Sequence, residues 1–138
     1  QKYWDRMLDI NLRALVYLSR LSIDEMKKKG GGAIINIASV SGKQVFPKHA
    51  MYNASKHGVV GFSGSLFEDI REFGIKVCAI CPGFVKTEMI ADVPLNLEKT
   101  IQPEDIAEAV RFVLEFPDTA CPTEILVRPQ RNPRIKRS

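Results

Sequence analysis

The chain has 138 residues, 45% of them hydrophobic and 26% charged, a composition typical of one globular domain or part of one. Its net charge of +4 comes from the end of the chain, because 128–138 hold five of the twenty basic residues and no acidic one. Residues 1–127 carry 15 basic against 16 acidic residues, which excludes the basic surplus that a nucleic-acid-binding surface needs.

Membrane and disulfide-rich classes are also disfavoured. No run of roughly eighteen apolar residues occurs, so we expect no membrane span. Three cysteines are too few for a disulfide framework, which favours a reducing, cytoplasmic compartment. The Pro-containing basic end is expected to be a flexible tail over 129–138, with a patch for anionic partners as the alternative.

The first predicted element is a long helix over 3–29, which the glycine run 30–32 ends. Apolar residues recur along it at helical spacing: Trp4, Leu8, Leu15 and Leu18. Asn11 falls on the same stripe, where an amide must find a partner or destabilise the fold. Taken alone, Asn11 is best interpreted as a buried amide that a neighbouring helix satisfies.

Two apolar runs, 33–39 and 74–81, have the length of strands and no polar alternation. Unbroken apolarity predicts strands covered on both faces, as in a parallel sheet. Cys78 and Cys81 lie three apart in the second run, so their side chains should point to opposite faces. We therefore expect two buried small hydrophobes and neither a metal site nor a disulfide.

A second long helix is predicted over 49–72, between these strands. Gly58, Gly61 and Gly64 are spaced along it so that another helix could approach closely. Three elements follow the second strand: a short helix and loop over 87–100, a helix over 102–116 and a strand over 123–129. The order α-β-α-β-α-β predicts a parallel sheet with right-handed crossovers.

Candidate functional residues gather at the carboxyl ends of the first two strands, where open α/β sheets bind their ligands. Ser39 ends the first strand, and Pro82 and Gly83 follow the second. Tyr52 begins the second long helix, and Lys56 lies one turn later on the same side. Taken alone, the tyrosine and lysine could be an ordinary surface pair.

Two other patterns predict no ligand site. The glycine run 30–32 precedes a strand instead of following one, so we interpret it as a helix stop and not as a phosphate cradle. His49 and His57 have no carboxylate or cysteine at ligand spacing, so no metal is expected.

Four segments together resemble the short-chain dehydrogenase/reductase family: WDRMLDINLRALV, GGAIINIASVSG, YNASK and CPGFVKTEM. They occur in the family's order and near its spacing, and the resemblance covers nearly all of 3–127. It implies that 1–128 form the carboxyl-terminal half of a Rossmann-like, doubly wound parallel sheet. A first half of about 90 residues, at roughly 30 per βα unit, would then precede this chain. The ending TEILVRPQ looks more like the branch that includes 3-hydroxy acid dehydrogenases.

The resemblance implies an oxidoreductase that transfers hydride between NAD(P), with NADP slightly favoured, and a small carbonyl or alcohol substrate. The implied catalytic residues are Asn11, Ser39, Tyr52 and Lys56. The implied cofactor contacts are Tyr52, Lys56, Pro82, Gly83, Val85 and Thr87. Tyr52 would exchange a proton with the substrate oxygen, which Ser39 would also hydrogen-bond. Lys56 would favour the phenolate and hold the nicotinamide ribose, and Asn11 would hold a water for proton relay.

A scaffold that does no chemistry and serves as a subunit-interaction module is the alternative, because nothing in this chain supplies a diphosphate site. The resemblance also implies a homodimer or homotetramer, with helices 3–29 and 49–72 forming a four-helix bundle with their symmetry mates. The family builds its substrate lid at the position of the short segment 88–101, so the resemblance also implies a small lid and a small or extended substrate.

Overall fold

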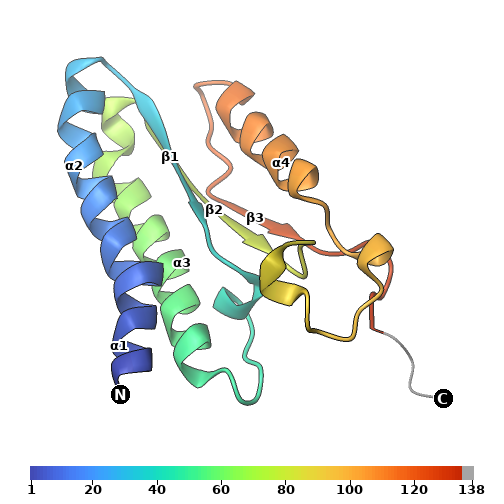
Figure 1. Ribbon diagram of the computed structural model, residues 1–138. Helices are drawn as coiled ribbons and strands as arrows, with labels where there is room; N and C mark the ends of the chain where they lie inside the picture. Colours follow the sequence, from blue (N-terminus) through green and yellow to red (C-terminus); the bar gives the residue numbers. More distant parts are fainter. Residues whose placement is uncertain (135–138) are drawn as a thin grey trace.

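A three-stranded parallel sheet lies at the centre of the computed structural model, which describes residues 1–134 (Figure 1). The strands are β1 (Gly32–Ile37), β2 (Ile75–Pro82) and β3 (Glu124–Val127), in the order β1-β2-β3. Both pairs of neighbours are parallel, as the alternation of helices and strands predicts. The Rossmann-like fold class is confirmed.

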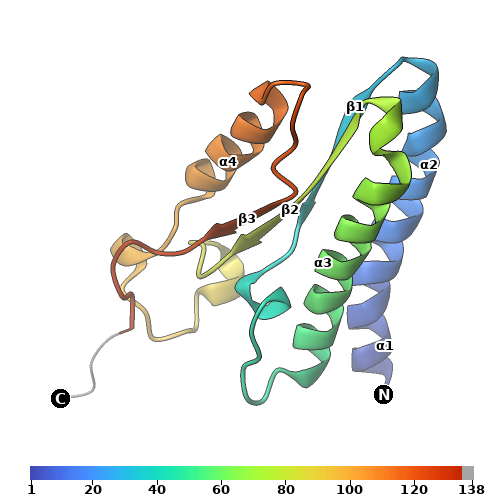
Figure 2. The same ribbon diagram turned by 180° about the vertical axis from the view of Figure 1, so that it is seen from behind.

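Helices cover both faces of this sheet. The helices are α1 (Lys2–Leu8), α2 (Ala14–Lys28), α3 (Ala50–Ile70) and α4 (Pro103–Glu115). In both views α2 and α3 lie side by side against one face, whereas α4 covers the other (Figures 1 and 2). The strands end near the start of α3, so this end of the sheet brings distant parts of the sequence together.

The central strand β2 is buried along its whole length apart from Lys76. Val77 faces α2 and α3, where it packs with Ile23 and Leu66. Cys78 faces α4 instead and packs with Val113, while Cys81 returns to the α3 face. The predicted two-sided burial is thus confirmed for β2, and so are the opposite faces of the two cysteines, each of which is fully buried and free. Burial alternates along β1 instead, and Ile37 is 44% exposed, so within residues 1–134 the prediction is wrong for that strand.

The long amino-terminal helix is continuous but not uniform, because a π-helical turn, Asp9–Arg13, separates α1 from α2. Side chains packed toward the core are Leu12, Leu15, Ser19 and Ile23. Trp4 and Leu18 are 57% and 65% exposed, so the predicted apolar stripe is wrong at both positions.

Glycines allow two of the predicted features. The glycine run ends α2 as expected, since Gly30 and Gly31 have φ angles of 78° and 155°, and Gly31 N donates to Met26 O. Gly58 lets α3 approach the π-turn, because a Cβ there would lie 2.8 Å from Leu12 Cδ2. A Cβ on Gly61 or Gly64 would meet nothing within 4 Å among residues 1–134, so neither glycine is needed for packing in this part of the chain.

Short 3₁₀ turns connect the main elements: Val40–Gly42, Arg71–Phe73, Glu88–Ile90 and Leu97–Lys99. Residues 129–134 run past the lid segment, where Asn96 N donates to Pro133 O. The flexibility expected for the 129–138 tail stays a prediction, and 135–138 lie outside the described residues. Within residues 1–134, no helix is both long and apolar enough to cross a membrane.

Candidate active site

The predicted site residues meet at the carboxyl edge of the sheet. Ala38 N donates to Ile80 O at 2.7 Å, which holds the end of β1 beside the end of β2. Ser39 and Gly83 therefore follow neighbouring strands, as expected from the sequence. The first turn of α3, with Tyr52, lies at the same end of the sheet (Figure 1).

Ser39 precedes the 3₁₀ turn Val40–Gly42 and is only 8% exposed. Its backbone is extended, and its Oγ accepts a hydrogen bond from Ser41 N at 3.1 Å. A hydroxyl has one proton and two lone pairs, so this bond fixes the oxygen and leaves the proton to donate. Ser39 can thus give a hydrogen bond to an oxygen placed over the strand ends.

Tyr52 and Lys56 are both half-buried on α3. Lys56 Nζ lies 5.8 Å from the centre of the Tyr52 ring and donates to Ile37 O at 3.1 Å. Burial lowers the pKa of the Lys56 ammonium from its ordinary 10.5, an effect that Cys81 opposes only in part. The pair is therefore anchored to the end of β1, which an ordinary surface pair would not be.

Asn11 lies in the π-turn and reaches the candidate catalytic helix. Its Nδ2 donates to Ser55 Oγ at 3.2 Å, and Ser55 Oγ donates to Tyr52 O at 2.8 Å. The amide is thus satisfied by the neighbouring helix, as one interpretation of the sequence expects. The π-turn itself was not predicted, although such turns often occur at functional sites.

The turn after β2 carries the remaining predicted residues. Pro82 is buried, and Gly83 N donates to Val127 O at 2.8 Å. Val85 is half-buried and forms an isolated bridge with Ile101, whereas Thr87 is exposed and its Oγ1 donates to Val85 O at 3.4 Å. The turn is therefore ordered beside the strand end.

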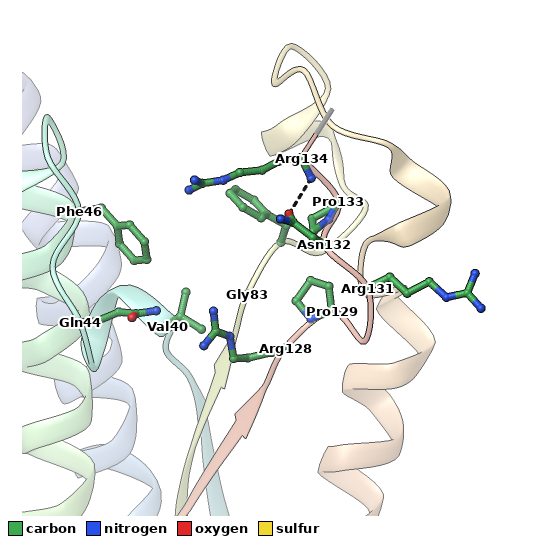
Figure 3. Close-up of a pocket in the computed structure, with 11 residues that line it drawn as sticks. Val40, Gln44, Phe46, Gly83, Arg128, Pro129, Arg131, Asn132, Pro133 and Arg134 are labelled. Atoms are coloured by element: carbon green, nitrogen blue, oxygen red, sulfur yellow. Dashed lines mark hydrogen bonds between the residues drawn. The ribbon is translucent and has the colours of Figure 1, made fainter. Parts of the chain in front are cut away.

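A pocket of about 530 Å³ opens next to these residues. The 3₁₀ turn after Ser39, the turn after β2 and the carboxyl-terminal segment 128–134 all line it (Figure 3). The contribution of 128–134 was missed, because a Pro-broken basic stretch has no periodicity that indicates a place in the fold. No cluster of three potential metal ligands occurs among residues 1–134.

This chain is similar to known proteins in sequence and in fold. A family model described as short chain dehydrogenase matches residues 1–98. An uncharacterized oxidoreductase of Staphylococcus saprophyticus is 35% identical over 126 residues, which are 91% of this chain and 54% of that protein. The chain thus spans about half the length of the curated relatives it matches.

Solved structures show the same fold. A 4-hydroxyisoleucine dehydrogenase complexed with NADH is 27% identical, with a TM-score of 0.81 over 94% of this chain and 59% of that chain. A closed form of serine dehydrogenase complexed with NADP⁺ is 26% identical, with a TM-score of 0.78 over 90% of this chain and 54% of that chain. From the family model, the relatives and the shared architecture, it follows that this chain belongs to the short-chain dehydrogenase family.

Proposed function

We propose that the protein carrying this chain is an NAD(P)-dependent oxidoreductase that interconverts a small carbonyl compound and its alcohol. The observation that carries the proposal is the anchored pair on α3. Lys56 is half-buried and lies beside the Tyr52 ring. It donates a hydrogen bond to Ile37 O at the end of β1, two residues before Ser39. Similar structures complexed with NADH and NADP⁺ support a nicotinamide cofactor.

In this proposal Tyr52 is the general acid and base. A nicotinamide bound here would supply or accept the hydride at the substrate carbon. In the reducing direction the Tyr52 hydroxyl gives its proton to the carbonyl oxygen, and in the oxidising direction the phenolate removes it from the alcohol. Lys56 places a positive charge beside this phenol, and the free proton of Ser39 stabilises negative charge as it develops on the substrate oxygen.

The donor set of Lys56 fits a ribose. An ammonium has three N–H donors, and among residues 1–134 only the bond to Ile37 O uses one of them. The other two can reach a pair of sugar hydroxyls. Val85 and Thr87, with Pro82 and Gly83, would line the nicotinamide side of the site. NADP is slightly favoured over NAD.

Asn11 is proposed to serve the proton path. Its bond to Ser55 holds the π-turn against α3, next to the backbone of Tyr52. A water held by Asn11 would link Lys56 to solvent and restore the proton that Tyr52 exchanges. The diphosphate site would come from a preceding half of the protein, in keeping with the half-length match to relatives. Buried, free cysteines are compatible with the cytoplasmic location that we propose.

The second candidate function is a scaffold without chemistry that serves as a subunit-interaction module. The half-length match to relatives favours it, since the diphosphate site of a dinucleotide fold lies in the first half. Titrating this chain alone with NADPH and NADH separates the two candidates. Low-micromolar binding would contradict the scaffold, and no binding by a protein that includes the upstream half would contradict the enzyme.

Replacing Tyr52 by phenylalanine tests the proposed chemistry. With a panel of ketones, 3-oxo acids and 3-hydroxy acids, Tyr52→Phe should lower kcat by at least about 10²-fold, because the proton donor is lost. Tyr3→Phe is the matched control, since Tyr3 is 71% exposed on α1 and should leave kcat unchanged. Undiminished turnover by the Tyr52 variant would refute the assignment.

A further inference from the structure

The pocket beside Ser39 has a size and place that suit a substrate. Its volume of about 530 Å³ lies in the range of small-molecule sites. Val40 of its lining is the residue after Ser39, and Phe84 follows Gly83 at the end of β2. The pocket therefore lies next to the strand end that carries Ser39.

The lining combines three arginines with no acidic residue. Arg128 and Arg134 point into the gap toward Gln44 and Phe46, whereas Arg131 points away from it (Figure 3). Four arginines elsewhere have carboxylate partners, Arg13, Arg20, Arg71 and Arg111, whereas Arg6 forms no ion pair within residues 1–134. Within residues 1–134, none of the pocket's three arginines has an ion pair.

The main chain on both sides of Arg128 is held firmly. Val127 pairs with Pro82 in the sheet, and its carbonyl accepts from Gly83 N at 2.8 Å. The ring of Pro129 packs on Gly83, where a Cβ would lie 3.0 Å from Pro129 Cδ. Arg128 thus projects from a fixed strand end, and a guanidinium on such a support can bind a planar anion through two parallel hydrogen bonds.

Arg134 is held less directly but from two sides. Its N–H bonds to Asn132 Oδ1 at 3.0 Å, and it forms an antiparallel bridge with Leu95 of the lid segment. Any movement of the lid would therefore move this second positive charge as well. The apolar part of the lining, with Val40, Phe46 and Phe84, can cover the carbon chain of a bound molecule.

We propose that Arg128, assisted by Arg134, binds a carboxylate of the substrate, so that the enzyme prefers small oxo and hydroxy acids to neutral ketones and alcohols. This inference rests on the proposed oxidoreductase function. The carboxylate would lie at the arginines and the reacting oxygen at Ser39 and Tyr52, with Phe46 and Phe84 beside the carbon chain. Arg128 then determines specificity and takes no part in proton or hydride transfer.

The test compares 3-hydroxybutanoate with its methyl ester in the protein that includes the upstream half. Arg128→Met should raise KM for the acid by about 10- to 100-fold, the effect of a charged hydrogen-bonding partner, and leave KM for the ester within about twofold. Arg128→Lys should restore part of the loss, because it keeps the charge without the fork. Arg111→Met is the control, since Arg111 lies on α4 and pairs with Glu108.

The outcomes separate this inference from the proposed function. Turnover with unchanged preference for the acid in Arg128→Met would refute the carboxylate site and leave the oxidoreductase standing. If Arg128→Met raises the KM for NAD(P)H instead, Arg128 binds the cofactor, and the carboxylate site is again refuted. Equal losses for acid and ester would mean a structural role only. If no substrate turns over, the proposed function fails, and calorimetry with 3-hydroxybutanoate then tests the carboxylate site alone. The parent protein should bind this acid more tightly than Arg128→Met does, and equal binding would refute the site.

Discussion

Lys56 must keep a positive charge in a place that disfavours it. Its side chain is half-buried between the end of β1 and the Tyr52 ring, and this burial lowers the pKa of its ammonium from 10.5. One carbonyl, Ile37 O, partly replaces the lost water. The proposed ribose hydroxyls would replace more of it, so cofactor binding and the charge of Lys56 should support each other.

Lys56 should set an alkaline limit to activity. The ammonium is present below the lowered pKa and is lost as the pH rises through it, so kcat/KM should begin to fall below pH 10.5. Lys56→Arg should keep measurable activity and move this alkaline fall in kcat/KM to a higher pH, because a guanidinium stays charged. Lys28→Arg is the control at an exposed position on α2, and it should show the same pH dependence of kcat/KM as the parent protein. If the alkaline fall in kcat/KM stays at the same pH in Lys56→Arg, a group other than Lys56 causes it.

The sequence predicts the part of the candidate site around Ser39 and Tyr52 better than the part around Arg128. Ser39, Tyr52 and Lys56 follow from strand ends and helix spacing, and the structure brings them to one edge. Arg128 could not be placed in this way. Its position depends on β3 pairing with β2 and on Pro129 packing against Gly83, which are contacts between distant parts of the chain.

At the level of elements, the turn that carries Ser39 packs tightly on α3. Gly42 N donates to Ser39 O at 2.8 Å and closes the turn. A Cβ on Gly42 would lie 2.6 Å from Lys56 O and 2.8 Å from Val60 Cγ2. Because Lys56 O is main chain, it cannot move aside as a side chain would, so the position of the turn relative to α3 depends on this glycine.

Gly42→Ala should therefore destabilise the protein and displace Ser39. We expect a loss of about 1–3 kcal/mol in the free energy of unfolding, the usual cost of overpacking, measured by urea denaturation. Glu115→Ala is the control, since Glu115 is exposed at the end of α4 and a surface substitution should change the free energy of unfolding by less than about 0.5 kcal/mol. Equal stability of the two variants would contradict the packing argument.

The helices and strands of residues 1–134 were predicted from apolar runs, glycines and prolines, with α1 and α2 as one helix, but the π-turn was not. The segment Asp9–Arg13 has ordinary helical composition, so local propensity does not indicate an extra residue in the turn. Tertiary contacts favour the turn instead. Asn11 bonds to Ser55 and Leu12 fills the space above Gly58, and both contacts depend on α3 lying alongside.

At the scale of the molecule, considerable apolar surface stays exposed on this chain. Tyr17, Leu18 and Leu21 of α2 are 62%, 65% and 74% exposed, and Ile37 at the end of β1 is 44% exposed. Surface of this kind usually marks an interface. Further strands beside β1 would cover part of it, and a second subunit against α2 and α3 would cover the rest.

We expect the complete protein to be at least a two-fold dimer through α2 and α3. The two helices lie side by side (Figures 1 and 2), and Gly61 and Gly64 leave the outer face of α3 open to close approach by another helix. Gly64→Glu should convert the dimer into a monomer with a folded subunit, because a Cβ at this position meets nothing within 4 Å among residues 1–134. Light scattering at micromolar concentration measures this change.

Ala107→Glu, at an exposed position on α4, is the control and should stay dimeric. A competing arrangement is that another part of the same subunit covers the outer face of α3. In that case Gly64→Glu would lower the unfolding temperature and leave the subunit number unchanged, because the introduced charge would be buried within one subunit. A parent protein that is monomeric at micromolar concentration would refute the dimer directly.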